Sequence, residues 1–225
     1  MAEGADPREA LGSTDVAERT AAARELATAG TPADLELLLG LAQTDKSPSV
    51  KLYCAAAASE IATRDVLDAG RRQQVLDTLR AWDPGTNPSL VLVFAGVTDA
   101  GGLKRLGLLL RDPRRDVRTA AATAVRRMAS LPQAPKGLAS EVGGWLRSGK
   151  YPADAVAELI RLAGEQGWVS QQEAIRVGAK TGRAAAEAAD QALEWLAARQ
   201  DPTSWDGTWM TTDDGKAEWL YILDR

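Results

Sequence analysis

A cluster of arginines between positions 111 and 127 contains the residues of this 225-residue chain best suited to bind a partner. Its members are Arg111, Arg114, Arg115, Arg118, Arg126 and Arg127. A guanidinium stays charged at neutral pH, and its planar fork of donors matches carboxylate and phosphate groups. Several of the arginines recur every three or four residues, which places them on one side of a helix. The cluster therefore indicates recognition of an anionic group.

The composition argues against catalysis. The chain has no histidine, which removes Ser-His-Asp and Cys-His catalysis, histidine acid–base chemistry and most zinc sites. Its single cysteine, Cys54, lies on an apolar stripe and is predicted to be a core residue. No glycine pair is followed by the Lys-Ser/Thr of a phosphate-binding loop. We therefore expect a protein that is not an enzyme and that has no cofactor and no metal site.

Positive charge is concentrated in one segment of an acidic chain. The whole chain has a net charge of −4, yet residues 101–150 hold eleven Lys and Arg against three acids, Asp112, Asp116 and Glu141. A basic centre between acidic ends predicts an anionic partner docking at the centre. We predict that this partner is an acidic protein segment. The residues expected to contact it are Arg114, Arg115, Arg118 and Arg126.

These arginines belong to a helical hairpin over residues 106–129. Pro113 cannot continue the first helix, so the chain turns at Asp112-Pro113 and a second helix starts near Arg115. Apolar residues in this second helix fall at i, i+3, i+4, i+7, i+8 and i+11, starting at Val117, and form one stripe. A single hairpin cannot bury that stripe alone and needs neighbours of the same kind.

The hairpin is repeated along the chain. The segment Arg-Thr-Ala-Ala-Ala occurs at residue 19 and again at residue 118, which are 99 residues apart. A Pro-Ser pair followed by Val or Leu places the intermediate equivalents of Arg118 at Lys51 and Val91. Weaker copies start near Asp154 and Arg183. Such self-similarity is typical of helical solenoids, and the uneven spacing predicts a lengthened linker followed by a shortened unit in the middle.

The order of a Leu-rich helix, an Asp-Pro turn, Asp-Val-Arg and then Ala-Ala resembles the HEAT repeat, in the short form of phycobilisome-lyase-like proteins. The resemblance implies a right-handed superhelix of antiparallel helix pairs, with the second helices lining a concave face that binds protein partners. It also implies that Arg118 forms a salt bridge with an acidic residue of the adjoining repeat and so links the two repeats. Arg19 and Lys51 are candidates for the same role.

The predicted architecture is all-α, with five to six helix pairs over residues 1–200 and a Trp-rich cap over residues 201–225. Predicted helices include residues 16–29, 49–63, 89–97 and 115–129. In the tail, residues 209–212 and 217–222 flank Asp213-Asp-Gly-Lys216 and read as a β-hairpin, with a short helix as the alternative. Trp205, Trp209 and Trp219 cap the open end of the array or dock a peptide.

The leading hypothesis for function is a non-catalytic scaffold or adaptor for protein–protein interaction. The alternative is a nucleic-acid-binding protein similar to HEAT-like alkylpurine DNA glycosylases, with the arginines on phosphates and Asp112 or Asp116 as the acid. A sequence pI near 5.1 argues against duplex binding. No apolar run is long enough to span a membrane and no signal peptide is recognisable, so we expect a cytoplasmic protein without a membrane partner.

Overall fold

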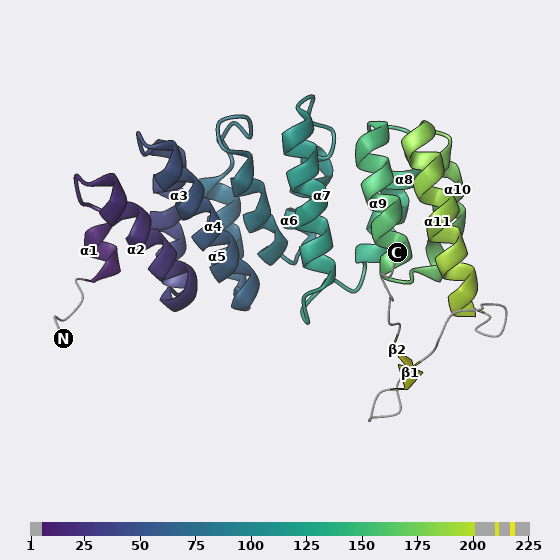
Figure 1. Cartoon of the computed structure of the whole chain (residues 1–225), viewed down its shortest axis with the longest axis horizontal. Coiled ribbons are helices and arrows are strands. Elements are labelled where there is room, and N and C mark those ends of the chain that lie inside the picture. Colours follow the sequence, from purple (N-terminus) through teal and green to yellow (C-terminus); the bar gives the residue numbers. More distant parts are fainter. Residues whose placement is uncertain (1–5, 201–209, 212–216, 219–225) are drawn as a thin grey trace.

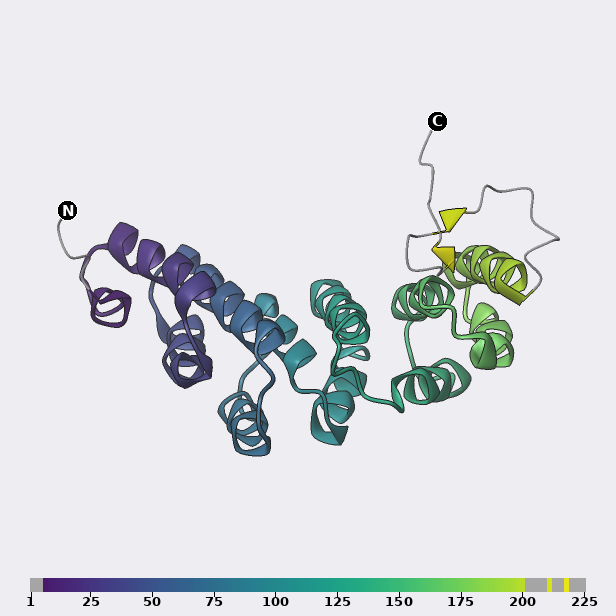
Figure 2. The ribbon, with the colours of Figure 1, turned by 90° about the horizontal axis from the view of Figure 1, so that it is seen from below.

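The computed structural model describes residues 6–200, 210–211 and 217–218. Over residues 6–200 the regular elements are all helical, and the helices stand side by side in two rows along an elongated molecule (Figure 1). Seen along the helix axes, the array bends, and one row lines its concave side (Figure 2). We call this the inner row and the other the outer row. Each outer helix is followed by its inner partner, which gives six pairs over residues 6–200.

The outer row holds the first element of each pair. Its members are α1 (Pro7–Ala10), α3 (Leu35–Thr44), α5 (Ala69–Thr78), α6 (Ala100–Leu109), α8 (Leu138–Arg147) and α10 (Gln172–Ala179). The inner row consists of α2 (Val16–Ala29), α4 (Pro48–Arg64), η2 (Pro88–Gly96), α7 (Arg115–Ala129), α9 (Ala153–Glu165) and α11 (Arg183–Gln200). Two short 3-10 helices, η1 (Pro32–Asp34) and η3 (Val169–Gln171), lead into α3 and α10. Successive inner elements pack on one another, so the predicted repeat copies are neighbours in space.

Aspartates start several of the helices. Asp15 accepts a hydrogen bond from the backbone N–H of Ala17 at 2.7 Å and caps α2. Asp68 and Asp99 cap α5 and α6 in the same way. Each carboxylate satisfies an N–H that has no partner inside the helix and interacts favourably with the helix dipole. The predicted helices at residues 16–29 and 115–129 are confirmed with these bounds.

The third inner element departs from the prediction. Residues 89–97 were expected to continue the series of α-helices, but η2 is a nine-residue 3-10 helix over Pro88–Gly96. Val91 and Val93 lower the α-helical propensity, because β-branched side chains lose rotamer freedom in an α-helix. A 3-10 helix rises about 2.0 Å per residue against 1.5 Å, so nine residues span roughly the length of twelve in an α-helix. The shortened unit thereby reaches across the row.

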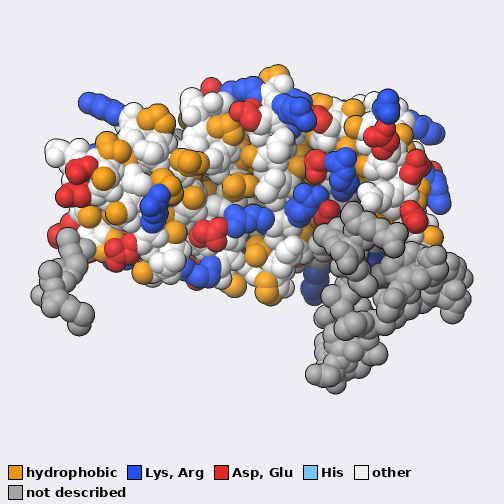
Figure 3. All heavy atoms as spheres, viewed as in Figure 1, with side chains coloured by type: hydrophobic (Ala, Val, Ile, Leu, Met, Phe, Trp, Pro, Cys, Tyr) orange, Lys and Arg blue, Asp and Glu red, His pale blue; other side chains and the backbone are white. Residues whose placement is uncertain are grey.

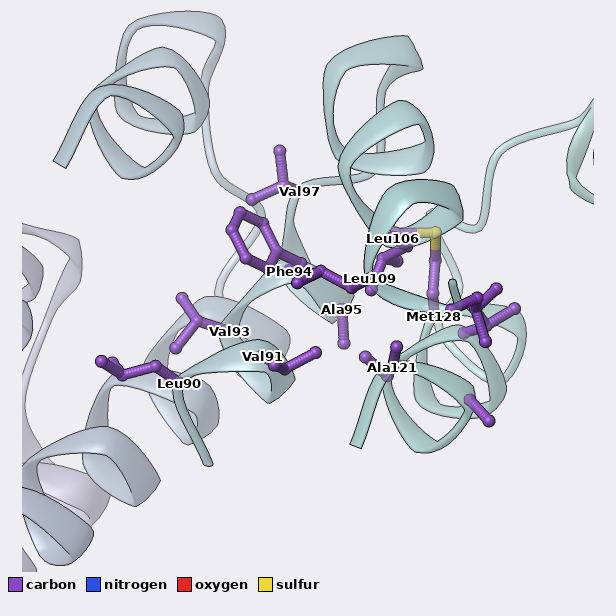
Figure 4. Packing of buried hydrophobic residues seen from close by; sticks show 14 of the residues in the cluster. Leu90, Val91, Val93, Phe94, Ala95, Val97, Leu106, Leu109, Ala121 and Met128 are labelled. Carbon is purple, nitrogen blue, oxygen red and sulfur yellow. The ribbon is translucent and has the colours of Figure 1, made fainter. Parts of the chain in front are cut away.

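Burial explains why η2 holds its place. Leu90, Val91, Val93 and Phe94 are fully buried between α4 on one side and α7 on the other. Figure 4 shows Val91 directed toward Ala121 of α7, whereas Leu90 is directed to the opposite side of η2. At the end of η2, a Cβ on Gly96 would lie 2.0 Å from the carbonyl oxygen of Ala62, so only glycine permits this approach to α4. The core therefore runs without interruption through the middle of the array.

The described part of the tail contains one antiparallel pairing. Strand β1 (Met210–Thr211) pairs with β2 (Ala217–Glu218), with Met210 opposite Glu218 and Thr211 opposite Ala217. This pairing flanks the predicted turn at residues 213–216 and agrees with the hairpin. Trp205, Trp209 and Trp219 lie outside the described residues, and so does the predicted cap that they form.

Candidate partner-binding face

Arg118 pairs with the next repeat, as the resemblance implied. Its guanidinium Nε and Nη2 donate to the carboxylate of Asp154 on α9, with Nη2 to Oδ2 at 2.5 Å. Its Nη1 donates to the carbonyl oxygens of Asp112 and Pro113 in the preceding turn, both at 2.8 Å. Burial disfavours the charge on Asp154, but the hydrogen bond and charge of Arg118 together with the hydrogen bond from the backbone N–H of Ala155 outweigh it, so the pKa of that carboxyl lies below its usual value. Arg118 therefore joins α7 to α9.

Arg19 makes the same set of bonds in the first unit. Nε and Nη2 donate to Asp45 at 2.9 and 3.1 Å, and Nη1 donates to the carbonyl oxygens of Ser13 and Thr14. The hydrogen bond from Arg19 lowers the pKa of Asp45. Both arginines lie near the start of inner helices, along the edge formed by the turns at the top of Figure 1. We call these two arginine–aspartate links the inner rail. Lys51, the third candidate, has no salt bridge among the described residues.

Arg114 supplies salt bridges next to the third unit, which lacks an arginine at the repeat position of Arg19 and Arg118. The equivalent of Arg118 in the third unit is Val91, which cannot bind a carboxylate. Arg114 instead donates to both oxygens of Asp112, at 2.8 and 2.9 Å, and to Asp83 of the long linker at 2.7 Å. The hydrogen bond from Arg114 lowers the pKa of each aspartate. Arg114 is therefore engaged within the chain.

Arg126 and Arg127 connect α7 to helices on its two sides. Arg126 donates to both carboxylate oxygens of Glu165 on α9, at 3.0 and 3.2 Å. Arg127 donates to Ser59 at 2.9 Å and to Glu60 at 2.6 Å, both on α4, so it links α4 to α7 past η2. Figure 3, which faces the inner row, shows basic and acidic side chains interspersed over α7 and α9. Most of the positive charge on α7 is thus neutralised within the chain.

Arg115 differs from the other three predicted contact residues. It is exposed and has no salt bridge among the described residues, and it lines a groove of about 590 Å³ between η2 and α7. The rest of the lining consists of one exposed acid, Asp116, and of small or apolar residues, namely Pro88, Ser89, Leu92, Thr119, Ala120 and Thr123. The structure therefore places one free cation beside an apolar floor on the concave side, and it separates Arg115 from three arginines that hold the array together.

A second group of cations without a carboxylate partner lies on the outer row of the described residues, and only Arg111 of this group was singled out from the sequence. Among the described residues, no carboxylate pairs with the cations of α6 and of the turn after it, which are Lys104, Arg105 and Arg111. Lys104, Leu108 and Arg111 follow the i, i+4, i+7 spacing of one helix face, and this spacing was the available signal.

The predicted core residue Cys54 is confirmed as fully buried, and burial raises the pKa of its thiol to about 12.

No family model and no curated protein matches the chain. Among solved structures, the chain is similar to two that are described as crystal structures of engineered proteins from the Northeast Structural Genomics Consortium. The first is 22% identical with a TM-score of 0.44, covering 85% of this chain and 95% of the other. The second is 20% identical with a TM-score of 0.44, covering 84% and 96%. Similarity at this level assigns neither a family nor a function.

Within the described part of the chain, no helix combines the length and apolarity needed to cross a membrane.

Proposed function

We propose that the protein is a non-catalytic scaffold, built as a right-handed solenoid, which holds a segment of a protein partner on its concave side. The observation that carries the proposal is the groove between η2 and α7, where Arg115 stands unpaired beside an apolar floor. A partner side chain inserts against Leu92 and Ala120, and a carboxylate of the partner binds the Arg115 guanidinium.

The pairing pattern favours a protein partner over the nucleic-acid alternative. Carboxylates of the same chain already form salt bridges with Arg114, Arg118 and Arg126. A duplex binder needs several cations free for phosphates, because each neutralised phosphate contributes to affinity. One free arginine in a small groove suits a single carboxylate of a peptide better than a row of phosphates.

The test is a selection of peptides from a random displayed library, followed by affinity measurement on variants. Thr119→Trp fills the groove, and Arg115→Glu reverses its charge. Each change is expected to weaken the selected peptides about tenfold or more, because it removes a contact worth 1.4 kcal/mol or above. Both side chains are exposed, so circular dichroism and the melting temperature are expected to match those of the unchanged protein.

Two results would overturn the proposal. One is that the selected peptides bind Thr119→Trp and Arg115→Glu as tightly as the unchanged protein. The other is that a short DNA duplex binds with a steep loss of affinity as salt rises, which is the behaviour of a phosphate-binding surface.

A further inference from the structure

The convex side of the array carries a second candidate site, independent of the groove described above. Of the eleven Lys and Arg in residues 101–150, four form salt bridges with carboxylates of the described residues, and all four belong to α7 or the residue before it. The remaining cations include three along α6 and its C-terminal turn, Lys104, Arg105 and Arg111. These three belong to the outer row, whereas Figure 3 faces the inner row.

Two adjoining clefts flank α6 on this side. The cleft between α5 and α6 has a volume of about 360 Å³ and is lined by Leu76, Arg80, Lys104, Arg105 and Leu108 among others. The cleft between α6 and α8 has about 420 Å³ and also includes Lys104 and Leu108, together with Arg111, Trp145 and Tyr151. Because Lys104 and Leu108 line both, the two clefts form one site with α6 as a low ridge. We call it the α6 cleft.

The aromatic wall of the α6 cleft is fixed in place before any ligand arrives. The Trp145 indole Nε1 donates to Glu141 at 3.1 Å, and its ring lies against Gly107, where a Cβ would stand 3.2 Å away. The Arg111 guanidinium lies 4.5 Å from the centre of the Tyr151 ring and donates to its hydroxyl at 3.0 Å. Cation–π contact and a hydrogen bond together hold this arginine while leaving it without an anion.

Arg105 is the most constrained cation of the cleft. It is half-buried, and among the described residues its Nε has no hydrogen-bond acceptor and its Nη2 donates to the carbonyl oxygen of Leu79 alone, at 3.4 Å. Burial lowers its pKa, because the charged guanidinium has lost water without gaining a counter-ion. A carboxylate brought next to Arg105 would compensate that loss. Of the acids near the cleft, Asp77 is paired with Arg80, whereas Glu141 accepts a hydrogen bond from the neutral Trp145 indole and keeps its negative charge.

We propose that the α6 cleft binds an acidic peptide segment of a partner protein that carries an apolar side chain between its carboxylates. The apolar side chain packs on Leu108, which is 52% exposed, and against Trp145. One carboxylate binds at Arg105 and Lys104, and another binds at Arg111. Charge complementarity selects the acidic residues, and the apolar ridge selects a hydrophobic one between them.

The probe is the fluorescein-labelled peptide Glu-Glu-Leu-Glu-Glu-Trp-Glu-Glu, with fluorescence anisotropy as the readout at low and at physiological salt. The double variant Lys104→Glu/Arg111→Glu is expected to weaken binding at least about tenfold, the equivalent of 1.4 kcal/mol. Leu108→Ser is expected to weaken binding about threefold or more without any change in charge. A peptide with Ser in place of Leu and Trp tests the same apolar contact from the other side.

The matched control is Lys136→Glu/Lys180→Glu, which makes the same change in net charge at two exposed lysines outside the cleft. If this control weakens the peptide as much as the cleft variant does, attraction is due to net charge and the proposal is wrong. It is equally wrong if neither the cleft variant nor Leu108→Ser affects binding. Arg115→Glu is expected to leave this peptide unaffected, which separates the α6 cleft from the concave groove.

Discussion

Helix α4 and the 3-10 helix η2 are consecutive members of the inner row that begin alike and fold differently. Ser47-Pro-Ser-Val starts the 17-residue α4, and Asn87-Pro-Ser-Leu starts the nine-residue η2. Both lie in the same place between neighbouring inner elements. The comparison shows that the position of a repeat in the array depends on its turn and its buried side chains, whereas its length and helix type can vary.

Larger core side chains compensate for the shortness of η2. Aligned at the common Pro-Ser, Phe94 of η2 corresponds to Cys54 of α4, and Leu90 corresponds to Val50. All four are fully buried. Bulkier side chains bury more apolar area per residue, which offsets the smaller number of residues in η2, because hydrophobic stabilisation follows the apolar area removed from water.

Polar contacts compensate for the missing rail arginine. Where α2 and α7 carry Arg19 and Arg118, α4 carries Lys51 and η2 carries Val91. The side chain of Asn87 donates to the carbonyl oxygen of Lys51 at 3.2 Å and to that of Ala42 at 3.1 Å, so it ties η2 to the second unit. Arg114 then ties the start of α7 to Asp83 in the linker before η2.

The largest expected effect comes from truncating the core of η2. Phe94→Ala should lower the free energy of unfolding by about 3–5 kcal/mol, since it opens a cavity that a 3-10 helix between two neighbours cannot close. Cys54→Ala at the matching position of α4 should cost only about 1 kcal/mol. Urea unfolding of both variants measures the difference. Equal losses would show that η2 contributes no more core than α4 does at this position.

A smaller effect is expected at the start of the same two elements. Asn87 is 8% exposed, and Asn87→Ala leaves two carbonyl oxygens without this donor, at an expected cost of about 2 kcal/mol. The side-chain hydroxyl of its counterpart Ser47 lies 2.9 Å from that of Ser49, and the hydrogen bond from Ser47 to Asp45 uses the backbone N–H, so Ser47→Ala should change stability by less than about 0.5 kcal/mol. Thermal and urea unfolding test the pair. A cost for Ser47→Ala as large as that for Asn87→Ala would contradict the assigned role of Asn87.

The smallest of the three effects concerns the inner rail and its pH dependence. Arg19→Ala should cost about 1.5 kcal/mol at pH 7, whereas Lys51→Ala, which breaks no salt bridge of the described residues, should cost close to nothing. Arg118→Ala should behave as Arg19→Ala does, because the two arginines make the same bonds.

The part of the Arg19→Ala effect that comes from Asp45 should be lost in acid, while the hydrogen bonds to the carbonyl oxygens of Ser13 and Thr14 do not titrate. In the native state Arg19 holds the pKa of Asp45 below its unfolded value near 3.9. A carboxyl with a depressed native pKa contributes stability above its unfolded pKa and loses that contribution as the pH falls through the native pKa. The difference between Arg19→Ala and the unchanged protein should therefore persist from pH 7 to about pH 5 and shrink below about pH 4. A difference that is constant down to pH 2.5 would show that the Arg19–Asp45 charge pair is not its source.

The sequence by itself determined the repeating unit. The apolar stripe of α7, the Asp-Pro turn and the copies at Arg19 and Arg118 depend on interactions within about 30 residues, and such local patterns can be read without coordinates. The burial of Cys54 likewise follows from its apolar stripe, whereas the pairing of Arg118 with the adjoining repeat was expected from the resemblance to the HEAT repeat.

Only the tertiary structure decided which arginines are available to a partner. Arg114, Arg115 and Arg126 look alike in sequence, but Asp83 and Glu165, far along the chain, bind two of them and leave the third exposed. The tertiary structure also determined the place of η2 in the inner row and the position of the α6 cleft. Val91 and Val93 lower the α-helical propensity of η2, but its place depends on packing against both α4 and α7. The spacing of Lys104, Leu108 and Arg111 indicates a shared helix face, whereas the cleft itself forms where α5, α6 and α8 meet, through contacts between residues distant in sequence.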